Sequence, residues 1–221
     1  SWVSYAIVGL SVWCGVILAF KWMKIRFQQS VLRLPLMPED PRFVLSPATV
    51  DAALDRIHAL VDDPQRFILT NRIVIALSNL KNMMRISDVD GVLKSQAEAD
   101  EDLVESSYTV VRGLLWMVPI FGFVGTVLGL AGGIGGFGRV LESASSIETL
   151  KPALQSVTSD LSVAFETTLH GLIGALSIHF VLTLVLRDEE SFLDSCREYC
   201  QKQIVGRLRF APTEAERDGG A

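Results

Sequence analysis

The sequence is poor in the residues that build disulfide frameworks, metal centres and nucleic-acid interfaces. Its 221 residues include three cysteines and three histidines, and the formal net charge is -5. Three cysteines make no disulfide framework, and no His or further Cys lies near them in the sequence. A net negative charge argues against binding to nucleic acid. We therefore interpret Cys14, Cys196 and Cys200 as structural and expect neither a metal nor another cofactor.

The residue patterns of enzymes and electron carriers are missing as well. Residues 133–138 match the pattern GxGxxG, but they end an apolar helix and follow no strand, which argues against a dinucleotide site. His170 and His179 are nine residues apart, on opposite sides of a helix, so they cannot hold one haem from a single chain. We therefore expect the chain not to be an enzyme or a redox subunit.

Charges are nearly absent from three long apolar segments, although 20% of all residues are charged. Residues 1–20 and 114–137 carry no charge, and residues 161–186 carry only Glu166. Each segment is near the roughly 20 residues that a helix needs to cross a bilayer. The first segment lacks the basic start of a signal peptide and exceeds its usual apolar length, so we interpret it as a retained span. The sequence predicts an all-α integral membrane protein with three transmembrane helices.

The distribution of basic residues predicts the orientation of these spans. Between the second and third spans only Arg139 and Lys151 are basic, whereas the segments before and after them are rich in Lys and Arg. Because basic loops stay in the cytoplasm, we expect the N-terminus outside the cell's cytoplasm and the C-terminus inside it. Residues 21–113 then form a cytoplasmic helical region, residues 138–160 a short periplasmic loop, and residues 187–221 a cytoplasmic helix with a disordered tail.

The predicted cytoplasmic segments show apolar residues at helical spacing and no period-two pattern. After a proline-rich connector, Ser46 and Pro47 predict the start of a helix. A second helix is expected over residues 64–84, and a third, capped by Ser87 and Asp88, is expected to run directly into the second span. An apolar stripe after the third span predicts that its helix extends into the cytoplasm. The members of this stripe are Leu193, Cys196, Cys200, Ile204 and Leu208.

The second span has a face of glycines, and the third span has a matching face of small residues. Such faces let membrane helices approach closely. Two interpretations stay open, packing around the axis of an oligomer and packing within one chain. Pro119 adds a predicted kink in the second span. The two faces comprise Gly122, Gly125, Gly129, Gly132 and Gly136 on the second span, and Ala164, Thr168, Gly171 and Ala175 on the third.

Two threonines are the candidate polar groups of these spans. Thr126 and Thr168 each lie in apolar surroundings, beside or within a small-residue face. A threonine hydroxyl in a helix commonly bonds to the carbonyl four residues earlier, which is the structural interpretation. The functional interpretation is that both hydroxyls line a narrow polar path and pass a hydrogen bond to a partner group. Because the sequence shows no obvious proton-carrying carboxylate on the small faces, we expect another chain to supply the titrating group.

Two segments resemble motifs of the MotA/TolQ/ExbB proton-channel family. Residues 119–129, PIFGFVGTVLG, resemble its P-x-x-G-L-L-G-T-V-x-G segment. Residues 164–172, AFETTLHGL, resemble its third-span A-x-x-A-T-x-x-G-L segment. The layout of spans and loops is similar to that of the three-span TolQ/ExbB branch, whereas MotA itself has four spans.

The resemblance implies a pore-forming subunit of a rotary motor that is driven by the proton-motive force and lies in a bacterial inner membrane, with the N-terminus in the periplasm. In such a motor a homopentamer surrounds two copies of a single-span partner of the ExbD/TolR type, which supplies a membrane Asp that binds the proton. The roles of the family's pore threonines fall to Thr126 and Thr168. Two alternatives stay open, a motor subunit of a phage-defence system and a non-conducting membrane scaffold.

Two positions depart from the family pattern. The family often has a Glu five residues before the third-span threonine, where this chain has Val163. Glu166 lies instead two residues before Thr168, which places it about 200° around the helix. Since His170 is its i+4 neighbour, a structural hydrogen bond and a contribution to the proton path both stay open for Glu166. Thr167 stands where alanine is usual, and it widens the polar stripe.

Overall fold

The computed structural model describes residues 2–38, 43–80, 86–143 and 147–209. Over these ranges the chain is mainly helical, and its one extended contact is a parallel bridge between Leu45 and Leu208. The predicted all-α class is therefore confirmed. The chain divides into two compact units. The span unit comprises Ser1–Trp22 and Ser107–Leu186, and the polar unit comprises Met23–Ser106 and Arg187–Ala221.

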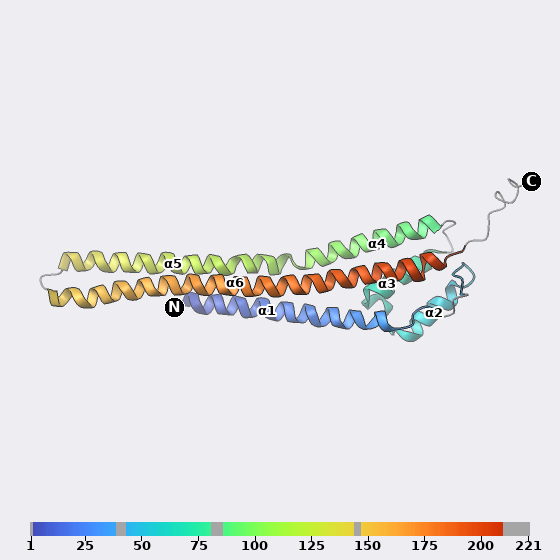
Figure 1. Ribbon diagram of the computed structural model, residues 1–221, viewed down its shortest axis with the longest axis horizontal. Coiled ribbons are helices and arrows are strands. Elements are labelled where there is room, and N and C mark those ends of the chain that lie inside the picture. Colours follow the sequence, from blue (N-terminus) through green and yellow to red (C-terminus); the bar gives the residue numbers. More distant parts are fainter. Residues whose placement is uncertain (1, 39–42, 81–85, 144–146, 210–221) are drawn as a thin grey trace, which may run out of the picture. The chain divides into compact units, whose positions relative to one another are not determined.

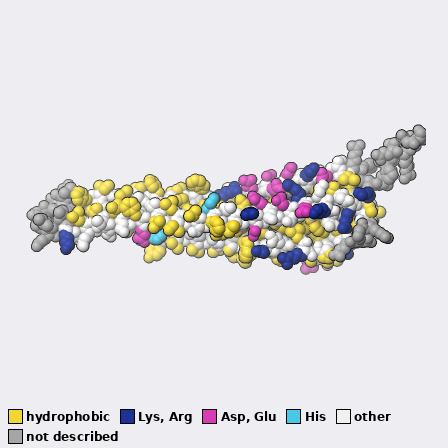
Figure 2. All heavy atoms as spheres, in the orientation of Figure 1, with side chains coloured by type: hydrophobic (Ala, Val, Ile, Leu, Met, Phe, Trp, Pro, Cys, Tyr) yellow, Lys and Arg dark blue, Asp and Glu magenta, His cyan; other side chains and the backbone are white. Residues whose placement is uncertain are grey.

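Three helices lie side by side in the span unit (Figure 1). They are the first part of α1 (Trp2–Gln29), α5 (Thr109–Ser143) and the first part of α6 (Ile147–Gln203). All three are long and apolar enough to cross a membrane, as predicted. Figure 2 shows hydrophobic side chains along this unit, and Trp116, Ile134 and Leu176 are 73%, 72% and 72% exposed. A large apolar surface of this kind is suited to lipid rather than to water.

Helices α5 and α6 are longer than the apolar runs that predicted them. Helix α5 extends to Ser143 and α6 begins at Ile147, so most of residues 138–160, predicted as a loop, is helical. The helices continue past the apolar runs because the end of an apolar run limits where a helix can contact lipid, and it does not limit the helix itself. The placement of residues 138–160 on the periplasmic side stays a prediction. Pro152 lies inside α6 and does not end it.

Helix α1 packs on α6 through a buried stripe. Ile7, Cys14 and Leu18 are all at most 1% exposed. A glycine on α6 makes the approach possible, because a Cβ at Gly174 would lie 2.9 Å from the Ser11 hydroxyl oxygen.

The first helix of the polar unit, α2 (Val50–Leu60), begins three residues later than predicted. The Thr49 hydroxyl accepts a hydrogen bond from the backbone N–H of Ser46 at 2.9 Å, and the Thr49 N–H donates to the Ser46 carbonyl at 3.0 Å. Residues 47–49 therefore form a turn, and the predicted helix start at Ser46 and Pro47 was wrong.

The next predicted helix is also shorter than expected at its start. Pro64–Arg66 forms the 3-10 turn η2, and α3 covers Ile68–Asn79. Gln28 at the end of α1 holds this junction, because its amide donates to the Arg66 carbonyl at 2.7 Å and accepts from the Ile68 N–H at 3.0 Å. The predicted end of this helix at Met84 lies outside the described residues. The predicted disordered tail from residue 211 onward also lies outside them.

The sequence predicted that helix α4 (Ile86–Ser107) runs straight into α5. In the structure it does not. Ser87 and Asp88 lie inside α4, so they are not its caps. Tyr108 interrupts the helix between α4 and α5, visible as a break in the ribbon (Figure 1). Tyr108 is fully buried, and Lys21 lies 3.7 Å from the centre of its ring. The predicted continuation of the third span is confirmed, because α6 reaches Gln203 without interruption.

Candidate functional site

Thr126 on α5 and Thr168 on α6 meet at the crossing of the two helices. Their hydroxyls are hydrogen-bonded to each other. Both also lie 3.3 Å from the carbonyl oxygen of Gly122 on α5 and 3.3 Å from that of Ala164 on α6. Each hydroxyl therefore contacts the carbonyl four residues earlier on its own helix and the equivalent carbonyl on the neighbouring helix. Both side chains are half-buried, so the pair stays accessible from one side.

Glycines on α5 allow this close approach. A Cβ at Gly122 would lie 3.2 Å from the Thr167 carbonyl oxygen and 3.3 Å from the Gly171 Cα. At Gly129 it would lie 2.7 Å from the Ala164 Cβ. The glycine face thus packs α5 on α6 within one chain, which was one of the two interpretations left open. Farther along, Gly132 and Gly136 have only ordinary contacts with α6, at 3.4 and 3.9 Å.

Thr167 fills the gap opposite Gly125. Its side chain is fully buried, and a Cβ at Gly125 would lie 2.6 Å from the Thr167 Cβ. The Thr167 hydroxyl bonds to the carbonyls of Val163 at 3.0 Å and Ala164 at 2.9 Å, both on its own helix. Its role as a contributor to a polar stripe stays a prediction, since its contacts here are those of a packing residue.

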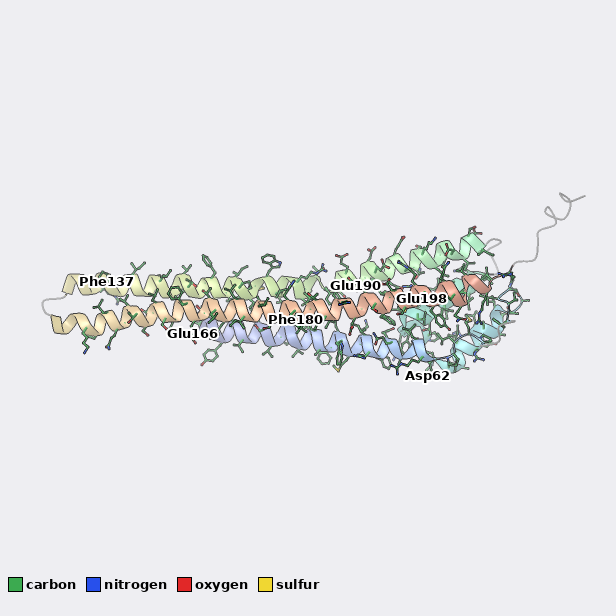
Figure 3. All side chains as sticks on the ribbon, in the orientation of Figure 1. Asp62, Phe137, Glu166, Phe180, Glu190 and Glu198 are labelled. Atoms are coloured by element: carbon green, nitrogen blue, oxygen red, sulfur yellow. The ribbon has the colours of Figure 1, made fainter. Side chains whose placement is uncertain are left out.

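Glu166 and His170 lie on exposed surface of α6, away from the hydroxyl pair. Figure 3 labels Glu166, whose side chain points outward from the helices. Within the described part of the chain, neither residue has a hydrogen bond or an ion pair. The predicted bond between them is therefore not formed in the single chain, and their contribution to a proton path stays a prediction.

Asp160 is a residue that the sequence analysis missed. It lies on α6 four residues before Ala164 and eight before Thr168, so all three share one stripe of the helix. A Cβ at Gly132 would lie 3.4 Å from the Asp160 Oδ2 atom, so the carboxylate contacts the glycine face of α5. The i, i+4, i+8 spacing was a signal for it, but Asp160 lies just outside the apolar run that defined the third span.

The buried thiols of the polar unit are unsuited to chemistry near neutral pH. Cys196 and Cys200 on α6 are buried and form no disulfide. Burial raises the pKa of Cys196 to about 12 and that of Cys200 to about 11. Thiolate is the reactive and metal-binding form, so these groups stay inert at pH 7. Within the described residues no group of His, Cys, Asp and Glu is placed to hold a metal.

Comparison with known proteins gives an independent view of the chain. Searches of curated proteins and of solved structures gave no significant match. The model of the MotA/TolQ/ExbB proton channel family matches residues 68–198, which is more than half of the chain. The matched range contains both threonines and the helices α5 and α6 that hold them. The protein with this hydroxyl pair between two membrane-crossing helices therefore belongs to the MotA/TolQ/ExbB proton channel family.

Proposed function

We propose that this chain is the pore-forming subunit of a rotary motor driven by the proton-motive force, of the three-span TolQ/ExbB type. The Thr126–Thr168 pair is part of its proton path. The observation that carries the proposal is the contact of these two hydroxyls at the crossing of two membrane-crossing helices. Membership of a proton channel family supports it.

The hydroxyl pair can relay a proton but cannot store one. A threonine hydroxyl has one donor hydrogen and two acceptor lone pairs, so it passes hydrogen bonds along a chain without ionising. Among the residues that the structure describes, the pair contacts only hydroxyl and carbonyl oxygens within hydrogen-bond distance. A titrating carboxylate must therefore come from elsewhere, and we assign it to the membrane Asp of a single-span partner of the ExbD/TolR type.

A groove between α5 and α6 offers a surface for such a partner helix. Its volume is about 640 Å³, and Pro119 and Leu172 line the end nearest the pair. The rest of its wall is mainly apolar, which suits a helix in lipid, and it also includes two basic or polar side chains. These lining residues are Leu115, Trp116, Ala175, Leu176 and Leu182, together with Arg112 and His179. In the proposed motor five copies of this chain surround two partner helices. The chain has its N-terminus in the periplasm and its C-terminus in the cytoplasm, and the torque drives a process at the cell envelope.

The first prediction tests the hydroxyl pair. Thr126→Val or Thr168→Val keeps the shape of the side chain and removes the hydroxyl. The chain is reconstituted in liposomes with a single-span partner of the ExbD/TolR type, and proton uptake is followed with a pH-sensitive dye under an imposed potential. Losing one hydrogen bond of about 1–1.5 kcal/mol in the path corresponds to a decrease in flux of roughly tenfold.

Thr183→Val is the matched control for this experiment. Thr183 lies on an exposed surface of α6, and within the described ranges its hydroxyl bonds only to the His179 carbonyl of its own helix, at 2.9 Å. We expect this variant to conduct as the unchanged chain does. Normal flux in both Thr126→Val and Thr168→Val would contradict the proposed path and favour a structural scaffold.

A further inference from the structure

Asp160 is an acid with a defined place on the helix crossing and with no polar partner among the described residues. Its side chain is half-buried, and within the described residues its carboxylate forms neither an ion pair nor a hydrogen bond. Taking a carboxylate partly out of water without a partner is unfavourable unless the group binds a cation or a proton. An acid at such a position in a membrane protein is a functional candidate.

The position of Asp160 relative to the spans fits an entrance. Its carboxylate faces Gly132, and from Arg112 to Gly132 helix α5 rises about 30 Å at about 1.5 Å per residue. That length equals the thickness of a hydrocarbon core. If Arg112 marks the cytoplasmic boundary, Asp160 lies at the periplasmic one.

The contact between α5 and α6 next to Asp160 determines by which route a proton could leave the carboxylate. Thr168 follows eight residues later, about 12 Å along α6. Between them, a Cβ at Gly129 would lie 2.8 Å from the Asp160 carbonyl oxygen and 2.7 Å from the Ala164 Cβ, so the helices touch and no water fits between them. A connection therefore runs along the accessible side of the crossing, where both the carboxylate and the hydroxyl pair are half-buried.

The charged groups nearest to Asp160 are few. The α5 surface that faces it consists of Gly129, Gly132 and Gly133, which carry no charge. Arg139 lies about two turns farther along α5, where its Nε donates to the Gly135 carbonyl at 3.2 Å. On α6 the other described ionisable side chains of this end are Lys151, Glu166 and His170.

We propose that Asp160 collects protons at the periplasmic end of the α5–α6 crossing and delivers them toward the Thr126–Thr168 pair. The inference rests on the proposed function, which it extends by naming the group that loads the path. The negative carboxylate attracts hydronium ions and holds a proton transiently. The proton then moves through water on the accessible side of the crossing. Asp160 thus acts before the partner's carboxylate.

The test measures proton flux in the reconstituted complex of chain and partner, as a function of the pH on the periplasmic side. Asp160→Asn keeps the shape and removes the charge. Since a local charge raises the concentration and capture rate of a counter-ion by about tenfold or more, we expect flux to fall by about tenfold, with a weaker dependence on periplasmic pH. Asp160→Glu should restore most of the flux. Glu190→Gln, an exposed acid near the other end of α6, is the control and should change nothing.

A chemical rescue separates charge from folding. Asp160→Cys is treated with a thiol reagent that adds a sulfonate or with one that adds a quaternary ammonium group. The native cysteines are buried and should not react. We expect the sulfonate to raise the flux of the assembled variant and the ammonium group to leave it low.

The outcomes distinguish this inference from the proposed function. The role of Asp160 would be overturned if Asp160→Asn conducts as the unchanged chain does, or if the two reagents have equal effects. The proposed function would still stand in that case, provided that the threonine variants block conduction. Absence of conduction in the unchanged complex would overturn both. If Asp160→Asn does not assemble, the comparison of the two reagents on Asp160→Cys decides whether the charge at residue 160 is needed for flux.

Discussion

A threonine in an apolar helix usually satisfies its hydroxyl on the carbonyl four residues earlier. Thr126 and Thr168 do so, and they also reach the equivalent carbonyl across the crossing. The cross-helix bonds exist because Gly122 and Ala164 let the two backbones come close. A Cβ at Gly122 would already lie 3.2 Å from a carbonyl oxygen of α6. The small residues therefore determine the hydrogen bonding of the threonines.

We predict that Gly125→Ala destabilises the span unit. Its added Cβ would lie 2.6 Å from the Thr167 Cβ, and Thr167 is fully buried, so the helices must separate. Overpacking of this kind typically costs about 1–3 kcal/mol. A lower midpoint of thermal unfolding in detergent, followed by circular dichroism, measures it.

Gly135→Ala on the same helix is the control, since a Cβ there meets no atom within 4 Å. Alanine favours a helix over glycine by about 1 kcal/mol, so this variant should unfold at the same temperature or higher. A destabilisation equal to that of Gly125→Ala would show that the contact with Thr167 is not the cause.

At the level of whole elements, the apolar runs predicted which segments are helical but not where each helix ends. Helices α5 and α6 continue beyond their apolar runs, whereas α4 ends at Ser107 without any Gly or Pro to announce it. Near this end the Ser107 hydroxyl oxygen accepts a hydrogen bond, at 2.5 Å, from the ammonium group of Lys21 on α1. A contact with a residue 86 positions away in the sequence has no local signature.

In the polar unit, α3 and α4 are joined by an ion pair between Arg72 and Asp100. The Arg72 side chain is 2% exposed, and its Nε and Nη2 both donate to Asp100 Oδ2, at 3.1 and 2.7 Å. We predict that Arg72→Met alone destabilises the protein by about 3–5 kcal/mol, because it leaves a carboxylate without its partner. Arg72→Met with Asp100→Leu should recover most of that loss. Chemical denaturation of the purified protein measures both.

The exposed pair of Arg66 and Asp63 serves as the comparison. Its side chains are 78% and 47% exposed, and the distance is 2.8 Å. An exposed pair contributes at most about 1 kcal/mol, so Arg66→Met should have little effect. Equal losses from Arg66→Met and Arg72→Met would contradict the importance of burial.

For the molecule as a whole, the two units bury different chemistry. The span unit exposes its large apolar side chains, while the polar unit encloses Arg72 together with the thiols of Cys196 and Cys200. The raised pKa values of these thiols connect burial to the pH dependence of stability, because the unfolded chain releases the thiol protons at lower pH than the folded chain.

We predict that the free energy of unfolding decreases as pH rises from about 9 toward 11. The ordinary thiol pKa is 9.0, and burial raises that of Cys196 to about 12 and that of Cys200 to about 11. Below pH 9 both states keep the thiol protons, so this contribution is fully present, and it is lost above pH 9. The variant Cys196→Ala/Cys200→Ala should show a weaker decline in a series of denaturation curves. An identical slope would contradict the effect of burial.

The amino-acid sequence alone determined the all-α class, the three membrane-crossing helices and the family. These features follow from long uncharged runs and from short motifs, which a chain carries whatever its contacts are. The sequence also identified Thr126 and Thr168 as candidates, through the resemblance of two segments to a known family. Only the tertiary structure decided that their hydroxyls meet, that Thr167 fills the space at Gly125, and that Asp160 faces Gly132. Spacing along one helix tells which residues share a face, but which face of another helix lies opposite depends on how the two backbones pack.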